Sequence, residues 1–233
     1  MAPWLRWVAI GGAALNPETE LFWEAIGVQI IKGYGLTETF IATCSSFRER
    51  RPGSVGIGVP GQEIRIAEDG EIWLRGPNVM EGYDGAPEAN AACFVDDWLR
   101  TGDVGRFDDD GHLYITGRVK NVVIGPSGLN IYPEDVEQVL SGDSRVGECV
   151  VVESPERPGR LWALIVPTVG GAELDDEALR LAVNERLSSH QRLDRIVVWP
   201  EADFPRTGSQ KIRRNVVVEQ LRAWSDRSQR AAA

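Results

Sequence analysis

The stretch "VQIIKGYGLTET", residues 28 to 39, joins an apolar strand pattern to two glycines and a polar turn. Its first half predicts a short buried strand that closes on Gly33 and Gly35. Its second half allows two interpretations. It is either a turn that leads into a short helix capped by Thr37, or it supplies a ring, a hydroxyl and a carboxylate to a ligand that carries phosphates and Mg²⁺. The pentapeptide "YGLTE" alone leaves both open.

The residues before this stretch complete an α/β unit. "LRWVAIGG" (5–12) predicts a buried strand, and "NPETELFWEAIG" (16–27) predicts a helix with Asn16 as N-cap and Gly27 as terminator. Parallel sheets normally contain more than two strands. We therefore expect that the chain is a piece of a larger protein and that an N-terminal portion is missing.

The residues after it change character twice. "IRIAEDGEIWLRG" (64–76) and "GRFDDDGHLYITGR" (105–118) predict hairpins around Asp-Gly turns, and so a small antiparallel sheet or barrel. From residue 119 the pattern is α+β: a strand over 121–124 and a helix over 133–140, followed by further strands and helices. We predict two domains, an incomplete large domain over 1–119 and a small domain over 120–233.

Composition excludes several classes of function. The chain has 233 residues and a net charge of −10, which argues against a nucleic-acid partner. No apolar run approaches the ~20 residues of a membrane span. Only two histidines are present, which disfavours histidine-rich metal sites, and the three widely spaced cysteines fit a reducing compartment. We expect a soluble cytoplasmic protein.

Several polar motifs remain ambiguous when taken alone. "TGD" (101–103) follows the strand "DWLR", and an acid at a strand end suits the two hydroxyls of a ribose; the alternative is an Asp-based turn. Arg118 is suited to ribose or phosphate oxygens. Lys120 is either a swivel point between domains or a solvated strand residue.

Two later motifs are equally ambiguous. "GPSGLN" (125–130) either lets a ligand approach the backbone closely or forms a plain hairpin loop. In "FPRTGSQKIRR" (204–214), Lys211 follows a polar loop. It either reaches a phosphate or a carboxylate in a neighbouring domain or is one of several basic residues at a helix start.

The order of the motifs is more specific than any one of them. The series YGLTE, WLRTGD, ITGRVKNVV, SGLNIYPEDVE and PRTGSQKI resembles the adenylate-forming (AMP-binding) family of acyl- and aryl-CoA synthetases, luciferases and peptide-synthetase adenylation domains. The resemblance runs from "GGAAL" to "KIRR". It implies the end of a large nucleotide-binding domain, an α/β unit plus a small antiparallel β-barrel, followed by a small mobile α+β C-terminal domain.

The resemblance also implies roles for residues of the large domain. Gly12 and Ala13 would line an adenine pocket, with Tyr34 stacking on the base and Gly35 beside it. Thr37 and Glu38 would contact phosphate and Mg²⁺. Asp103 would bind the ribose hydroxyls, with Arg118 assisting.

In the small domain, the resemblance makes Lys211 the catalytic lysine that bridges the acyl carboxylate and the α-phosphate. Gly128 and Asn130 fall on the loop that guides the thiol in the second step. Lys120 falls on the hinge. The implied cofactors and substrates are ATP/AMP, Mg²⁺, coenzyme A and a carboxylic acid.

The implied activity is that of an ATP-dependent acid–thiol ligase. "SGLNIYPEDVE" favours a CoA ligase for medium- or long-chain fatty acids, and an acyl carrier protein remains an alternative acceptor. Three departures stand out: Gln210 replaces the family's usual glycine, "GPSG" (125–128) is one residue longer than the loops of many relatives, and the glycine-rich phosphate loop is missing. The isolated chain is therefore expected to be inactive. In the alternative interpretation, the chain is a catalytically inactive fragment, or a subunit that binds nucleotide or complements a separate N-terminal chain. A third and weaker interpretation is a pure interaction module.

Overall fold

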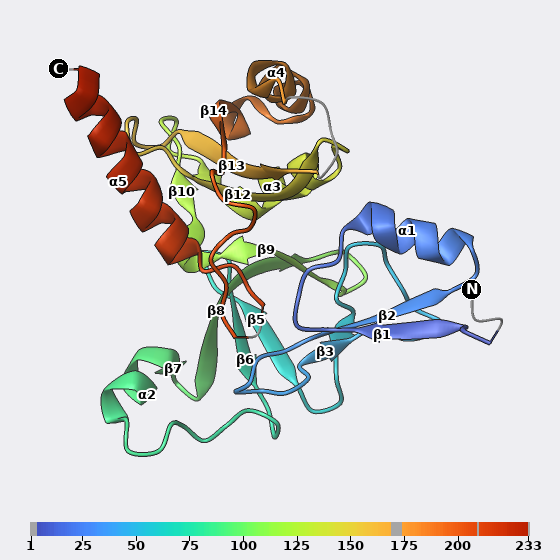
Figure 1. Ribbon diagram of the computed structural model, residues 1–233. Coiled ribbons are helices and arrows are strands. Elements are labelled where there is room, and N and C mark those ends of the chain that lie inside the picture. The colour runs from blue at the N-terminus through green and yellow to red at the C-terminus, as the bar shows by residue number, and fades with distance from the viewer. Residues whose placement is uncertain (1–3, 169–173, 209, 233) are drawn as a thin grey trace. The chain divides into compact units, whose positions relative to one another are not determined.

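The computed structural model describes residues 4–168, 174–208 and 210–232 (Figure 1). The chain divides into two compact units, Met1–Lys120 and Asn121–Ala233. The division falls one residue after the boundary predicted from the sequence.

The first unit begins with the predicted α/β element. Strand β1 (Trp7–Ile10), helix α1 (Pro17–Ala25) and strand β2 (Gln29–Tyr34) follow one another, and β1 pairs with β2 in parallel (Figure 1). The Asn16 side chain accepts a hydrogen bond from the Glu18 amide at 2.8 Å, which caps the helix. Gly27, at φ +88°, follows its end. The predicted order of strand, helix and strand is confirmed, but the prediction that the first strand is buried is wrong, because β1 alternates between exposed and half-buried residues and Trp7 is 53% exposed.

Short antiparallel strands extend this sheet. The strand order is β1-β2-β3-β4, where β3 is Thr43–Cys44 and β4 is Ile57–Gly58. Among the described strands, β1 pairs only with β2 and therefore lies at an edge of the sheet.

A second, antiparallel sheet completes the first unit. Its order is β5-β6-β8-β7, with β9 paired to the second half of β8. The elements are β5 (Glu63–Ile66), β6 (Glu71–Arg75), α2 (Pro87–Cys93), β7 (Phe94–Val95), β8 (Trp98–Phe107) and β9 (Leu113–Arg118). Both predicted hairpins are present, with Gly70 and Gly111 at positive φ in their turns. The core of the sheet is formed by Ile72, Leu74 and Leu113, which are fully buried.

The prediction that "TGD" follows a strand end is wrong. Strand β8 runs without interruption through residues 101–103. The backbone bulges there instead: Gly102 has φ +70°, and its amide donates to the Glu71 carboxylate at 2.9 Å. The register between β6 and β8 shifts at the same place. Asp103 is therefore a strand residue placed by a bulge.

The second unit is a three-stranded sheet covered by helices on both faces. The sheet order is β12-β13-β14, with β12 antiparallel and β14 parallel to β13. The elements of the second unit are, in chain order, β10 (Val123–Ile124), β11 (Asn130–Ile131), α3 (Pro133–Ser141), β12 (Val146–Glu153), β13 (Leu161–Pro167), α4 (Asp176–Arg186), η2 (Ser189–Gln191), β14 (Leu193–Val198) and α5 (Arg214–Ala232).

Alternation along β12 builds two cores. Val151 faces the cluster that contains residues of α3 and α4, whereas Val150 and Val152 face the cluster that contains Val217 of α5. The predicted strand over 121–124 is wrong in its first half, because Val119–Asn121 form the 3₁₀ turn η1 and only Val123–Ile124 pair as a strand. No helix in the described ranges is long and apolar enough to cross a membrane.

Candidate functional site

Two predicted binding segments follow the carboxyl ends of β1 and β2. These strands are parallel, with Ile10 opposite Lys32, so the segments that follow them leave the sheet at the same edge. Gly12 and Ala13 follow the first strand and are exposed, and Tyr34 and Gly35 close the second. The carboxyl edge of parallel strands is where open α/β sheets bind ligands.

Three of the predicted site residues meet at one point. The Tyr34 hydroxyl donates to Oδ2 of Asp103 at 2.9 Å, and Nε of Arg118 lies 2.9 Å from Oδ1 of the same carboxylate. These side chains come from β2, β8 and β9, and Asp103 lies opposite Arg118 in the register of the last two strands. Asp103 is 5% exposed, whereas about half of the Arg118 side chain is exposed. The cluster is a buried carboxylate with one guanidinium facing solvent.

The environment of Tyr34 keeps its phenol protonated. Burial and the neighbouring Asp103 carboxylate raise the pKa of Tyr34 well above its ordinary value of 10.0. Because folding raises this pKa, the associated stability is fully present below pH 10.0, the value for the unfolded chain, and is lost as the pH rises through the folded-state pKa.

This shift predicts the outcome of an alkaline titration. Below about pH 11, the folded chain and its Tyr34→Phe variant are expected to give the same rise in phenolate absorbance, because Tyr34 stays protonated in the folded state. In strong urea the two proteins are expected to differ by one titrating phenol near the ordinary pKa. One additional phenol titrating in the folded unaltered chain would contradict the buried hydrogen bond.

The segment after Tyr34 is a tight turn and not a capped helix. A Cβ on Gly35 would lie 1.8 Å from the carbonyl oxygen of Phe40, so only glycine fits there. The hydroxyl of Thr39 accepts from the Leu36 amide at 3.0 Å, and Phe40 has φ +55°. The capping role that the helical alternative gave to Thr37 is wrong, and Thr37 is exposed.

Glu38 is held by a residue that the sequence did not single out. The Tyr83 hydroxyl donates to Oε1 of Glu38 at 2.6 Å, and the Met80 amide donates to the Glu38 carbonyl oxygen at 2.8 Å. The hydrogen bond to Glu38 raises the pKa of Tyr83 to about 12. The only sequence signal for Tyr83 was a Gly-Tyr pair shortly before α2.

The remaining predicted site residues lie on η1 and in the second unit. Lys120 is exposed on η1, so its description as a strand residue is wrong. Gly128, at φ +78°, lies in the exposed loop of the β10–β11 hairpin, and Asn130 is exposed on β11. The plain hairpin geometry expected of "GPSGLN" is therefore present, and Gly128, Asn130 and Lys211 belong to the second unit.

Lys211 lies in a turn that is held by a backbone hydrogen bond and by the side chain of Arg206. The Thr207 amide donates to the Lys211 carbonyl oxygen at 2.8 Å. Arg206 donates to the Gln210 carbonyl oxygen at 2.9 Å and pairs with Asp203 and with Glu148 of β12. Gln210 has φ +66°, a left-handed conformation that favours glycine. The sequence flagged Gln210 as a departure but gave no sign of the Arg206 contacts.

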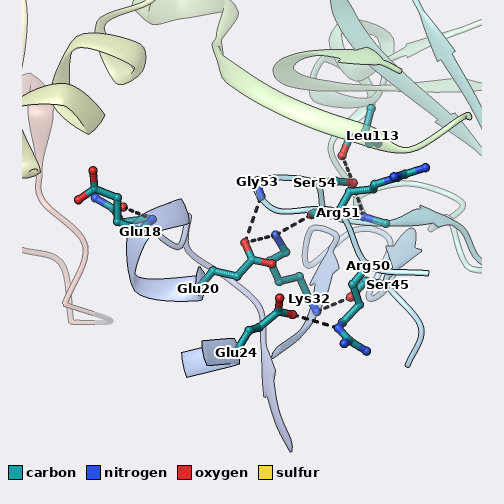
Figure 2. A network of polar contacts seen from close by, with 12 residues as sticks. Glu18, Glu20, Glu24, Lys32, Ser45, Arg50, Arg51, Gly53, Ser54 and Leu113 are labelled. Atoms are coloured by element: carbon teal, nitrogen blue, oxygen red, sulfur yellow. Dashed lines mark hydrogen bonds and ion pairs between the residues drawn. The ribbon is translucent and has the colours of Figure 1, made fainter. Parts of the chain in front are cut away.

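A buried ion pair supports the strand that carries Tyr34. Figure 2 shows Nζ of Lys32 on β2 bonded to Oε2 of Glu20 on α1 at 2.6 Å. The same carboxylate oxygen accepts from the Gly53 amide at 3.0 Å, and the Lys32 amide donates to the Ser45 hydroxyl at 2.7 Å. Glu20 is 0% and Lys32 is 6% exposed. The pair fixes helix α1 against β2, two residues before Tyr34.

Comparison with known protein families identifies the class of enzyme to which the chain belongs. Residues 1–84 match the family described as AMP-binding enzyme, and residues 135–211 match the AMP-binding enzyme C-terminal domain. The chain belongs to this family, the adenylate-forming acyl-CoA synthetases.

Similar proteins are CoA ligases for different acids. A long-chain-fatty-acid–CoA ligase of Mycobacterium bovis is 40% identical over 143 residues, 61% of this chain and 24% of that enzyme. The long-chain-fatty-acid–CoA ligase of Bacillus subtilis is 34% identical over 230 residues, 90% of this chain and 40% of that enzyme. The O-succinylbenzoate coenzyme A synthetase of Bacillus subtilis, solved with AMP, has a TM-score of 0.80 and 31% identity, covering 90% of this chain and 45% of that one.

A further structure of this synthetase contains ligands, and the relatives are longer than this chain. The same synthetase has been solved with ATP and a magnesium ion. The chain spans less than half the length of each of these relatives.

Proposed function

We propose that this chain forms part of an ATP-dependent acid–thiol ligase. A carboxylate oxygen attacks the α-phosphorus of ATP, the bond to pyrophosphate breaks, and an acyl-adenylate forms. A thiol sulfur, having lost its proton, then attacks the acyl carbon, and AMP leaves. The proposed acceptor is CoA, with an acyl carrier protein as the alternative, and the proposed acid is a medium- or long-chain fatty acid.

The convergence of Tyr34, Asp103 and Arg118 carries this proposal. A buried carboxylate accepts hydrogen bonds from vicinal hydroxyls, and an exposed guanidinium beside it suits ribose or phosphate oxygens. The acid expected on the ribose and the arginine expected to assist it are thus in contact. Gly12 and Ala13 at the neighbouring sheet edge support an adenine pocket there.

The residues that would serve Mg²⁺ fit that ion only in part. In the described ranges, no group of three or more acids, histidines or cysteines could hold a metal ion. Glu38 offers one carboxylate, and Mg²⁺ is commonly held by one or two carboxylates together with substrate phosphates. When bound, the ion would neutralise charge on the phosphate oxygens. Thr37 and Lys211 are the proposed phosphate contacts of the protein itself.

Calorimetry with AMP tests the proposed nucleotide site. We expect the 233-residue chain to bind AMP, and Asp103→Asn to weaken the affinity about 10-fold or more, because a hydrogen bond to a charged group is worth about 1.5–3 kcal/mol. The control is Asp109→Asn in the β8–β9 turn, which should not change the affinity. Equal AMP affinity in the Asp103 variant, or no binding by the unaltered chain, would contradict the proposal.

A second candidate is a subunit that complements a separate N-terminal chain. The observation that favours it is the exposure of large apolar side chains on and before the edge strand β1 and on helix α1: Trp4, Trp7 and Phe22 are 83%, 53% and 59% exposed. We propose that the isolated chain does not catalyse carboxylate-dependent exchange between ATP and pyrophosphate, and that an N-terminal half of a relative restores exchange. Robust exchange by the isolated chain would contradict this candidate.

A further inference from the structure

The Glu38 carboxylate is the only acid that the proposed function assigns to the metal, and its orientation is set by neighbours that no motif identifies. Glu38 lies on an irregular turn after β2, where a side chain has several accessible rotamers. An oriented carboxylate binds a metal ion more tightly than a freely rotating one, because less entropy is lost on binding. The residues that hold Glu38 therefore matter for the metal.

Tyr83 holds one oxygen of this carboxylate. The distance of 2.6 Å from its hydroxyl to Oε1 of Glu38 is that of a charge-assisted O–H···O⁻ hydrogen bond, which is about twice as strong as a neutral one. In the described part of the chain, no hydrogen bond engages the other oxygen, Oε2. The arrangement leaves Oε2 as the oxygen available to a further partner.

Asn90 in turn holds Tyr83. Its side-chain oxygen accepts from the Tyr83 amide at 2.7 Å, and its side-chain nitrogen donates to the Tyr83 carbonyl oxygen at 2.9 Å. One side-chain amide thus satisfies both backbone groups of Tyr83 from helix α2. Gly82 makes this possible: it has φ +149°, and a Cβ there would lie 3.0 Å from the Asn90 amide.

Backbone contacts bring the two segments together independently of the Tyr83 hydroxyl. The Met80 amide bonds to the Glu38 carbonyl oxygen, and the Asn78 side chain donates to the carbonyl oxygens of Thr39 and Ile41 at 2.9 and 2.7 Å. The turn that carries Glu38 is therefore anchored by its backbone, while the hydroxyl of Tyr83 acts on the carboxylate alone. Removing that hydroxyl leaves the anchors in place.

We propose that Tyr83, fixed by Asn90, is a positioning residue that orients Glu38 toward the divalent cation of the nucleotide. This inference rests on the proposed function, because the metal role of Glu38 belongs to it. Tyr83 touches neither the substrate nor the cation. It limits the carboxylate to the orientation in which Oε2 is presented.

The test is a titration of Mn²⁺, as a paramagnetic substitute for Mg²⁺, into the full 233-residue chain with saturating ATP, followed by electron paramagnetic resonance. We expect Tyr83→Phe to weaken Mn²⁺ binding about 10-fold, since loss of a partner that orients a metal ligand typically costs 10–100-fold in affinity. Asn90→Leu is expected to act in the same direction. The matched control is Tyr114→Phe, whose hydroxyl faces Asp108 at 3.4 Å and should leave Mn²⁺ affinity unchanged.

Glu38→Gln separates failure of this inference from failure of the proposed function. If Glu38→Gln weakens Mn²⁺ binding and Tyr83→Phe does not, the positioning role is wrong and the metal role of Glu38 stands. If Glu38→Gln has no effect, or the unaltered chain binds no Mn²⁺ with ATP, both are overturned. Affinity for ATP without a divalent cation is expected to be equal in the unaltered chain and Tyr83→Phe; a parallel loss would indicate a general structural defect and would also overturn the inference.

Discussion

Replacement of Lys32 by methionine is expected to destabilise the first unit by about 3–5 kcal/mol, because it leaves the Glu20 carboxylate buried without its cation. In the described ranges, the Gly53 amide would remain as the only partner of that carboxylate. The measurement is urea unfolding together with hydrogen exchange of the β2 amides, which reports on the first unit separately.

Two further variants serve as controls for Lys32→Met. Arg51→Met removes an exposed ion pair with Asp110 in the same unit and is expected to cost less than about 1 kcal/mol. Combining Lys32→Met with Glu20→Leu removes both charges and is expected to be less damaging than Lys32→Met alone. A loss below about 1 kcal/mol for Lys32→Met would show that the pair does not hold α1 against β2.

Replacement of Lys211 by alanine is expected to lower the rate of acyl-adenylate formation by about 10²–10³-fold, the range for losing one group that stabilises transition-state charge. The assay uses this chain together with an N-terminal portion that supports adenylation. Thioester formation from supplied acyl-adenylate is expected to continue at an unchanged rate, because the proposed role of Lys211 ends when pyrophosphate leaves.

The two half-reactions make the Lys211 result interpretable. Arg213→Ala, an exposed residue two positions further on, serves as the control and is expected to change neither step. An equal loss in both steps for Lys211→Ala would mean that the substitution disturbs the small unit as a whole. The role assigned to Lys211 would then be wrong.

Local signals in the sequence predicted most of the elements. The helix at α1 follows from a capping asparagine before a proline, and the two long hairpins follow from Asp-Gly turns between alternating strands. Both sets of signals act over a few residues, so no knowledge of the rest of the fold was needed. The wrong prediction at "TGD" lies where a distant contact decides, because the bulge at Gly102 depends on the Glu71 side chain from another strand.

The site could be predicted only in part for the same reason. The order of motifs indicated Tyr34, Asp103 and Arg118, but the hydrogen bond between Tyr34 and Asp103 joins residues 69 positions apart. Nothing in the spacing predicts which strands pair to bring them together. Tyr83 was missed because its partner Glu38 is 45 positions away and Gly-Tyr pairs are common in loops.

The central claim is that AMP lies against the cluster of Tyr34, Asp103 and Arg118. A crystal structure of this chain soaked with AMP tests it most directly. The account predicts the ribose hydroxyls within about 3.2 Å of the Asp103 carboxylate, with the adenine beside Gly12 and Ala13. AMP bound at any other place, with Asp103 still enclosed by its present partners alone, would contradict it.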